Sequence, residues 1–267
     1  MIGFLRATFT IIILLIVTLP LIPIQISLNL FNLKAKRRLP VLWHRFAARV
    51  VGLKISLHGE ISKKRPLLIA SNHISWLDIV VLSASGPVSF IAKQEVSGWP
   101  AFGILAKLQR TVFINRERRS ATGEKTNEIA ERLNEGDAMV LFAEGTSTSG
   151  VHVLKFRSAL LGAAQKAIGK EETVFIQPVA LAYTHLHGMP AISSERPITG
   201  FYGDMAMAPH LLGILKEGAI DVSIHFGEPL PVTAKMGRKN LAQKLEEEVR
   251  AMKTAALRGK MISREQK

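Results

Sequence analysis

The sequence of 267 residues contains no cysteine. That absence excludes disulfides, thiolate metal ligands and a cysteine nucleophile, and it is compatible with a reducing compartment. Aromatic residues make up only 6% of the chain, whereas nucleic-acid readers often add aromatic platforms to their basic patches, and no nucleic-acid recognition motif is present. Any covalent chemistry therefore needs an oxygen or nitrogen nucleophile, and nucleic acid is not an expected partner.

Acidic residues are scarce as well. The chain has 21 Asp and Glu against 35 Lys and Arg, which gives a net charge of +14. Such a surplus favours a polyanionic partner, namely a phospholipid surface, a nucleic acid or an acidic carrier protein, without choosing among them. The basic residues form short clusters at 34–38, 63–65 and 116–119 rather than one long tail.

Charged residues are missing altogether from 7–33, a run of apolar sequence long enough to cross a bilayer core of about 30 Å. Pro20 and Pro23 interrupt it, so a single span and a re-entrant hairpin both stay open. A cleaved signal peptide fits poorly, because Arg6 is the only charge before a run that is too long and lacks a cleavage pattern. The basic cluster that follows predicts that the remainder of the chain faces the cytoplasm.

The remainder of the chain alternates short apolar runs with helical patterns. An amphipathic stretch at 42–51 precedes the predicted strands, which are 53–57, 67–70, 88–92, 111–114, 138–142, 174–180 and 222–226. Helices are predicted at 121–134 and 155–166. We expect an α/β fold with a mixed, largely buried β-sheet flanked by helices. The predicted organisation is an anchor and amphipathic helix (1–50), a catalytic domain (51–235), and a charged C-terminal helix and tail (236–267).

The segment SNHISWLD places His73 five residues before Asp78, directly after a predicted strand. Five positions on a regular helix are about 140° apart, so the two side chains cannot share one helical face. If Ser75 is the N-cap, however, Asp78 lies in the first turn and its carboxylate reaches back to the imidazole. An Asp on one ring nitrogen fixes the tautomer and leaves the other nitrogen to take a proton from an alcohol.

The same residues have a purely structural interpretation. Ser75 and Asp78 have the spacing of an ordinary capping box, in which case His73 is only a turn residue with a satisfied hydrogen bond. The His–Asp spacing taken alone favours that interpretation.

Four ordered blocks change the balance. The order from Asn72 to Asp78 resembles the NHxxxxD block of the glycerolipid acyltransferases, the family of 1-acylglycerol-3-phosphate acyltransferases. FINR (113–116), FAEGT (142–146) and IQPV (176–179) resemble further blocks of that family, in the same order. The resemblance extends over 53–232 and implies the fold of this family.

The resemblance also implies site residues. His73 would be the general base and Asp78 its orienting partner, and Asn72 in the same block would bind substrate. Lys93 and Arg116 would bind anionic groups of the acceptor beside Asn115, and Glu144, Gly145 and Thr146 would shape the acceptor site. Lys155 is a further cation for a phosphate. Taken singly, Arg116 is also explained as part of a solvated basic face, and Glu144 as the cap of a turn.

Three positions depart from the family pattern. Asn115 stands where Asp is usual, Ala143 where Pro is usual, and Ser147 where the lysophosphatidate enzymes often have Arg. The first two changes are tolerable, since Asn keeps a turn hydrogen bond and Ala only loosens a φ constraint. The third removes a cation from beside the expected phosphate and bears on the identity of the acceptor.

Lysophosphatidate, which gives phosphatidic acid, is the acceptor that the family resemblance places first. The alternative is the lyso form of an ornithine lipid, because the stretch EGTSTSG (144–150) resembles the bacterial lyso-ornithine-lipid acyltransferases and a smaller net charge needs that Arg less. By the same resemblance the donor is an acyl thioester, on coenzyme A or on an acidic acyl-carrier protein.

Other functions explain less. A serine hydrolase would need a nucleophile elbow, but Ser149 occupies the fifth position of Gly145–Ser149, where that motif requires Gly. A non-enzymatic basic membrane-surface protein would leave the four blocks unexplained. No cofactor or metal is expected, and His185 and His187 are interpreted as structural.

Overall fold

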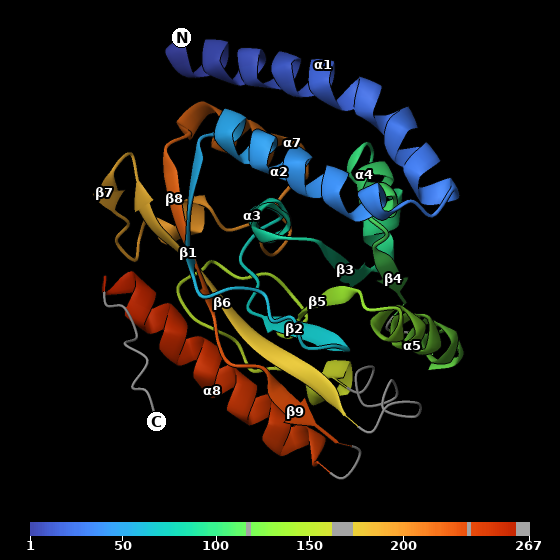
Figure 1. Ribbon diagram of the computed structural model, residues 1–267. Helices are drawn as coiled ribbons and strands as arrows, with labels where there is room; N and C mark the ends of the chain where they lie inside the picture. The colour runs from blue at the N-terminus through green and yellow to red at the C-terminus, as the bar shows by residue number, and fades with distance from the viewer. Residues whose placement is uncertain (116–118, 162–172, 234–235, 260–267) are drawn as a thin grey trace.

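A computed structural model describes residues 1–115, 119–161, 173–233 and 236–259 as a sheet with helices on both faces (Figure 1). The sheet is mixed, and its strands follow the order β1-β8-β6-β2-β5-β3-β4, with β7 and β9 paired to β6. The strands are β1 (Leu53–His58), β2 (Leu67–Ser71), β3 (Val88–Lys93), β4 (Val112–Ile114), β5 (Ala138–Phe142), β6 (Val174–Leu186), β7 (Met189–Pro190), β8 (Ile220–Phe226) and β9 (Leu230–Val232).

The centre of the sheet explains its uninterrupted apolar runs. Every residue of β2 and of β5 is buried, because helices cover both faces. Alternate side chains along β2 enter two separate cores: Leu67 and Ile69 enter one, and Leu68 and Ala70 enter the other. Parallel strands buried on both faces are expected to be continuously hydrophobic rather than alternating.

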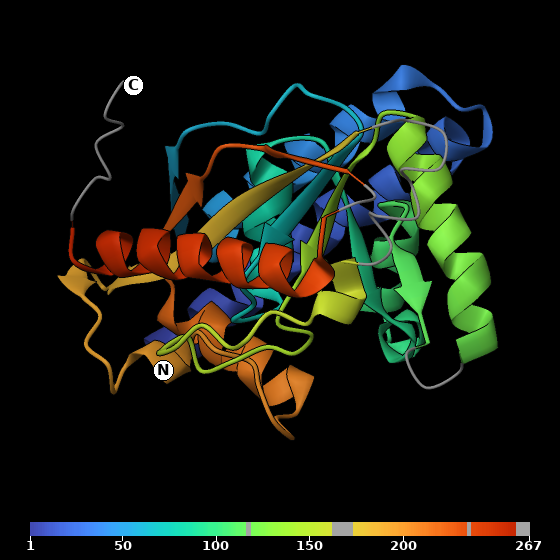
Figure 2. The ribbon, with the colours of Figure 1, turned by 90° about the horizontal axis from the view of Figure 1, so that it is seen from below.

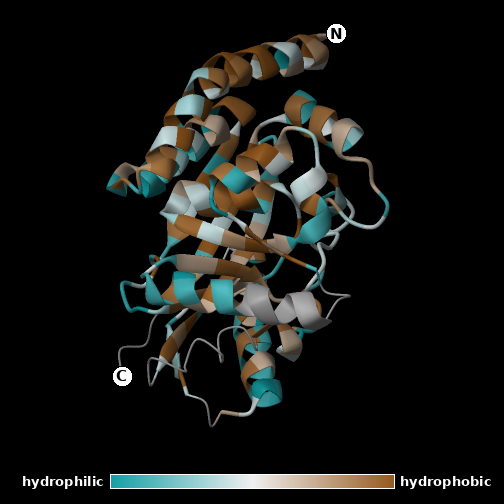
Figure 3. Ribbon diagram, turned by 90° about the vertical axis from the view of Figure 1, so that its right-hand side faces the viewer, coloured by the Kyte–Doolittle hydropathy of each residue, from teal (hydrophilic) through white to brown (hydrophobic). Residues whose placement is uncertain are grey.

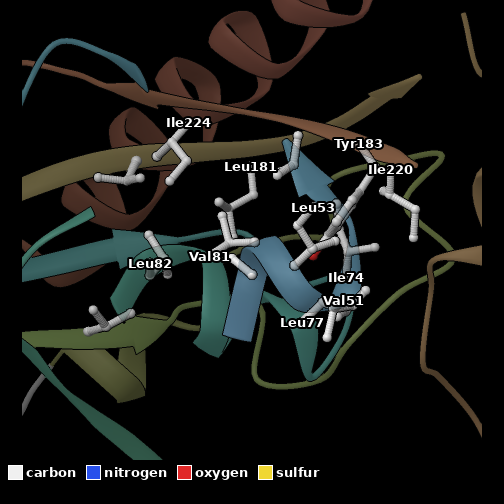
Figure 4. Packing of buried hydrophobic residues seen from close by; sticks show 14 of the residues in the cluster. Val51, Leu53, Ile74, Leu77, Val81, Leu82, Leu181, Tyr183, Ile220 and Ile224 are labelled. Carbon is white, nitrogen blue, oxygen red and sulfur yellow. The ribbon is translucent and has the colours of Figure 1, made fainter. Parts of the chain in front are cut away.

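The first core lies beneath α2 (Arg38–Val51), α3 (Leu77–Ser85) and α7 (Met207–Glu217). In Figure 4 Leu77, Val81 and Leu181 belong to one packed group in this core. The second core lies beneath α5 (Arg119–Asn134) and α8 (Arg238–Leu257). Short elements complete the described chain: η1 (Lys34–Arg37), η2 (Gln94–Gly98), α4 (Phe102–Leu108) and η3 (Arg196–Ile198).

The N-terminal apolar run is a single helix, α1 (Ile2–Leu30), with Pro20 and Pro23 inside it. The re-entrant hairpin is therefore wrong, because the helix continues through both prolines. By length and composition α1 can cross a membrane. Most of its large apolar side chains are exposed, and in Figure 3 it is predominantly hydrophobic along its length.

Polar side chains fix α1 along the catalytic domain at both of its ends. Arg6 donates hydrogen bonds to the backbone oxygens of Leu215 and Val51. Near the other end, the Gln25 and Asn29 amides donate to the Leu108 oxygen over 3.3 and 2.9 Å. These contacts hold α1 flat against the domain, with its apolar residues outward.

The C-terminal charged segment is built into the domain rather than appended to it. Figure 2 shows α8 lying over one face of the sheet, where it packs mainly against β6. Its buried residues Leu241, Leu245 and Val249 follow the four-residue spacing of one helical face and enter the second core. The tail predicted beyond it falls largely at 260–267, outside the described residues.

The seven predicted strands all appear, at nearly the predicted bounds. The exception is β6, which continues six residues past the predicted end at Ala180 and pairs antiparallel with β8 there. The helix predicted at 121–134 is α5, whereas residues 155–157 are not helical and 158–161 are. The rest of the helix predicted up to residue 166 lies outside the described part of the chain.

Because α8 supplies part of the second core, Leu245→Ala should lower the free energy of unfolding by about 2 to 5 kcal/mol through the cavity it leaves. The exposed neighbour Gln243→Ala is the control and should change it by less than about 0.5 kcal/mol. Denaturant unfolding of the detergent-solubilised protein measures both. Equal, small effects would mean that α8 is peripheral.

Candidate active site

The sheet topology brings three of the four sequence blocks to one edge. Strands β2, β5, β3 and β4 are parallel neighbours in that order, so their carboxyl ends lie side by side. His73 follows β2, Glu144 follows β5, Lys93 ends β3 and Asn115 follows β4. The carboxyl edge of a parallel sheet is where α/β proteins bind ligands.

His73 and Asp78 form the predicted pair. The imidazole Nδ1 lies 2.8 Å from Asp78 Oδ2, and the ring stacks on Phe142 with centroids 3.9 Å apart. The Asp78 side chain is fully buried, whereas that of His73 is 21% exposed. With Nδ1–H donated to the carboxylate, Nε2 is the ring nitrogen left to accept a proton from a bound alcohol.

The Asp78 carboxylate has four hydrogen-bond donors. Oδ2 also accepts the backbone N–H groups of Ile74 and Ser75, over 2.6 and 3.0 Å. Oδ1 accepts the Tyr183 hydroxyl over 2.8 Å, from strand β6. Asp78 thus both shapes the loop and bonds the imidazole, so the structural interpretation does not exclude the catalytic one.

Ser75 does not cap the helix with its side chain. Helix α3 begins at Leu77 with Trp76 as its N-cap, and within the described chain Ser75 Oγ is buried without a hydrogen-bond partner. The capping-box prediction is wrong in that half only, since the Asp78 carboxylate does bond the Ser75 N–H. The loop therefore depends on Asp78 rather than on Ser75.

Glu144 joins the two loops that flank His73. Its Oε1 accepts the His73 N–H over 3.0 Å and its Oε2 accepts the Leu154 N–H over 3.1 Å. Gly145 follows with φ of +76°, a left-handed conformation that favours glycine and turns the chain sharply after β5. Thr148 closes the turn, donating from its N–H and its hydroxyl to the His73 oxygen.

Burial raises the pKa of the Glu144 carboxyl to about 7, against the opposing effect of its two backbone donors and of Lys253. Lys253, on α8, is itself only 3% exposed and donates to the His152 oxygen over 3.3 Å. Burial lowers the pKa of its ammonium to about 8, although Glu144 opposes that shift. Glu144 and Lys253 are thus both buried and each affects the pKa of the other electrostatically.

Asn72 holds the loop rather than offering a group to a substrate. It is fully buried; its Nδ2 donates to the Leu181 oxygen over 3.1 Å and its Oδ1 accepts the Leu181 N–H over 2.8 Å. Both ends of the amide are occupied by strand β6. This corrects the expectation that Asn72 binds substrate.

The remaining predicted binding residues border the site. Lys93 and Lys155 are exposed, and Asn115, Thr146 and Ser147 are half-buried. Arg116 lies outside the described residues. These positions stay predictions of acceptor contact, placed by topology near the loop that carries His73.

The fourth sequence block, IQPV (176–179), lies within strand β6 of the sheet. Gln177 is buried in β6, where its amide donates to the oxygens of Glu60 and Gly227 and accepts the Ser62 N–H. His185 and His187 contact Asp221 and Glu217 separately. Among the described residues, no group of three or more His, Asp or Glu side chains is placed to hold a metal ion.

Two contributors were missed by sequence reasoning. Tyr183 reaches Asp78 from 105 residues away, and Lys253 reaches the catalytic loop from a helix to which the sequence assigned no chemistry. The one available signal was weak: Lys253 lies four residues after the apolar Val249, on the buried face of α8.

Comparison with known proteins finds similar acyltransferases. Residues 54–182 match the family model described as Acyltransferase. A lyso-ornithine lipid O-acyltransferase of Brucella abortus is 51% identical over 98% of this chain and 99% of its own length. One from Rhizobium meliloti is 42% identical over 98% and 91%. A 1-acyl-sn-glycerol-3-phosphate acyltransferase of Neisseria gonorrhoeae is 32% identical over 77% and 76%.

The fold also has a solved counterpart. The crystal structure of the 1-acyl-sn-glycerophosphate (LPA) acyltransferase PlsC from Thermotoga maritima superposes with a TM-score of 0.67. The two chains are 21% identical, and the match covers 95% of this chain and 94% of that one. The architecture is therefore shared well beyond sequence similarity.

Replacing Asp78 separates its role from that of Ser75. Asp78→Asn should lower kcat by at least about a hundredfold, because the imidazole loses the partner that fixes its tautomer. Ser75→Ala, in the same loop, should leave both kcat and the melting temperature nearly unchanged, since Ser75 Oγ bonds nothing in the described structure. A Ser75→Ala protein that is as impaired as Asp78→Asn would contradict this assignment.

Glu144 should also make stability depend on pH. Between pH 4.5 and about 7 the folded state keeps a proton on Glu144 that the unfolded state has lost, so stability falls as pH rises through this range. The loss reaches at most about 3 kcal/mol. Glu144→Gln removes this titration, so the stability of wild type relative to the variant should decline from pH 5 to pH 7. If the difference in unfolding free energy between wild type and Glu144→Gln stays constant from pH 5 to pH 7, the raised pKa of Glu144 is refuted.

Proposed function

This chain belongs to the glycerolipid acyltransferase family and is an O-acyltransferase of the lysolipid type, and we propose that its acceptor is the lyso form of an ornithine lipid. The observation that carries the proposal is the likeness to two enzymes of that name over almost the whole chain. The relatives that act on 1-acylglycerol-3-phosphate are less similar and match a smaller share of the chain. The order of acceptors predicted from the sequence is thereby reversed.

The reaction follows from the His73–Asp78 pair. Nε2 of His73 takes the proton of the acceptor hydroxyl while that oxygen attacks the carbonyl carbon of an acyl thioester. The C–O bond forms, the C–S bond breaks, and the imidazolium returns its proton to the leaving thiolate. Asp78 stabilises the imidazolium while it carries that proton.

The neutral residue at position 147 supports the choice of acceptor. A phosphomonoester carries nearly two negative charges and is best held by a bidentate Arg. An ornithine head group carries one carboxylate and one ammonium, so its net charge is zero. It therefore does not need an additional cation at position 147, where this chain has Ser. Lys93 is the exposed cation at the end of β3 and is our choice for the carboxylate, with the exposed Lys155 as a second cation and Arg116 as a third that rests on the sequence pattern alone.

The family resemblance supports an acyl thioester as donor, and the basic chain would attract both coenzyme A and an acidic carrier protein. The acceptor reaches the enzyme from the membrane, with which the outward apolar face of α1 associates. We place the catalytic domain on the cytoplasmic side of the bacterial inner membrane, on the basis of the basic residues that follow α1.

Acyl transfer by the purified full-length protein tests the acceptor. We expect kcat/KM to be at least about tenfold higher for the lyso-ornithine lipid than for lysophosphatidate, with either donor. Ser147→Arg should shift the ratio toward lysophosphatidate by supplying a charge-assisted contact of about 1.5 to 3 kcal/mol. His73→Ala is the inactive control. Preference for lysophosphatidate in the wild-type protein would overturn the proposal.

A further inference from the structure

Two of the basic clusters in the sequence meet in space, away from the catalytic edge. Arg37, of the cluster at 34–38, donates to the Glu135 oxygen, and Arg65, of the cluster at 63–65, donates to the Gly136 oxygen. Both therefore hold the turn between α5 and β5. This turn lies where β5 begins, whereas His73 and Glu144 lie where β2 and β5 end.

The centre of this basic cluster is one buried carboxylate, that of Asp137, which is 4% exposed. It forms ion pairs with Arg37 at 2.6 Å, Arg132 at 2.5 Å and Arg110 at 3.3 Å. Three arginines on one carboxylate already exceed its charge. The carboxylate of Glu135, which is 60% exposed, contacts only Arg110, at 3.6 Å, among the ion pairs of the described residues.

Positive charge remains in excess there. Lys36 and Arg65 interact electrostatically with the same group, so five cations face two carboxylates. Burial, together with neighbouring cations, lowers the pKa of Lys36, Arg65 and Arg110. The arrangement is therefore one that an added anion would stabilise.

The cluster also has open hydrogen-bonding capacity beside a small cavity. Lys36, Arg37, Arg110 and Asp137 line one cavity. Within the described chain, Arg37 Nε and Arg110 Nη1 are buried without a hydrogen-bond partner; Nη1 lies near Asp137 but is not aligned with it. The Arg37 side chain is 40% exposed, so part of the guanidinium faces solvent.

The surroundings point to a lipid rather than to a soluble anion. Lys36 and Arg37 directly follow the end of α1, where Leu30, Phe31 and Leu33 are 75%, 69% and 49% exposed. Leu42, in the first turns of the next helix α2, is 60% exposed as well. Fixed cations bordered by exposed apolar side chains match the polar and apolar parts of an anionic phospholipid.

We propose that the basic cluster of Lys36, Arg37, Arg65 and Arg110 binds the phosphate of an anionic membrane phospholipid, at a site separate from the catalytic one. Arg37 and Arg65 supply the accessible donors, while Asp137 keeps the arginines in place. The bound lipid fixes the end of α1 that lies away from the catalytic edge.

Vesicle binding by the full-length protein tests this site. The variant Lys36→Gln/Arg65→Gln removes two charges and leaves the ion pairs of Asp137 intact. Its control, Lys239→Gln/Lys244→Gln, removes two exposed charges from α8. Flotation compares vesicles of phosphatidylcholine alone with vesicles in which about a third of the lipid is phosphatidylglycerol.

We expect wild type and control to prefer the anionic vesicles, and the preference of the cluster variant to fall by about thirtyfold while its binding to phosphatidylcholine stays unchanged. Equal melting temperatures would verify that all three proteins are folded, and Lys36→Gln alone replaces the double variant if it does not fold. The proposal is overturned if the α8 control loses as much preference as the cluster variant. It is also overturned if inorganic phosphate abolishes the preference more than chloride of equal ionic strength, since the site would then take the free anion.

Discussion

The buried Asp78 carboxylate is the constraint on which the catalytic loop depends. Its four donors come from the imidazole of His73, from two backbone N–H groups of the loop and from the Tyr183 hydroxyl on strand β6. An ionised carboxylate is expensive to bury unless its lone pairs are satisfied, and here each oxygen has at least one donor. One residue thereby sets the loop conformation, the direction of the His73 ring and the distance between loop and sheet.

A second carboxyl supports the same loop from the opposite side. Glu144 binds the His73 N–H, yet it is buried deeply enough for its pKa to reach about 7, although a buried lysine of the C-terminal helix, Lys253, opposes that shift. His73, the predicted general base, is therefore held by contacts that come from β2, β5, β6 and α8. Catalytic geometry needs this degree of support, since small displacements of a base cost large factors in rate.

Sequence reasoning predicted the strands because β2 and β5 are buried on both faces and so carry uninterrupted apolar runs. It predicted the His73–Asp78 pair from the resemblance to the NHxxxxD block, because the spacing taken alone favoured an ordinary capping box. It could not supply Tyr183 or Lys253, whose contacts depend on how β6 and α8 pack, or the burial of Asn72, which the family block alone suggested as a ligand. Sequence reasoning also did not predict the acceptor, because the neutral Ser147 favoured the lyso-ornithine lipid whereas the family pattern favoured lysophosphatidate.

The attachment of α1 at both ends has a consequence for how the enzyme searches for its acceptor. A catalytic domain on a flexible tether would tumble above the bilayer and meet lipids in random orientations. Here Arg6 joins α1 to the domain near Val51, and Gln25 joins it near Leu108, so the helix and the domain rotate as one body. Once the apolar face of α1 is in the membrane, the remaining freedom is translation in the plane and rotation about the membrane normal. The encounter between enzyme and lysolipid then becomes a two-dimensional diffusion problem, governed by the surface density of the acceptor rather than by its bulk concentration.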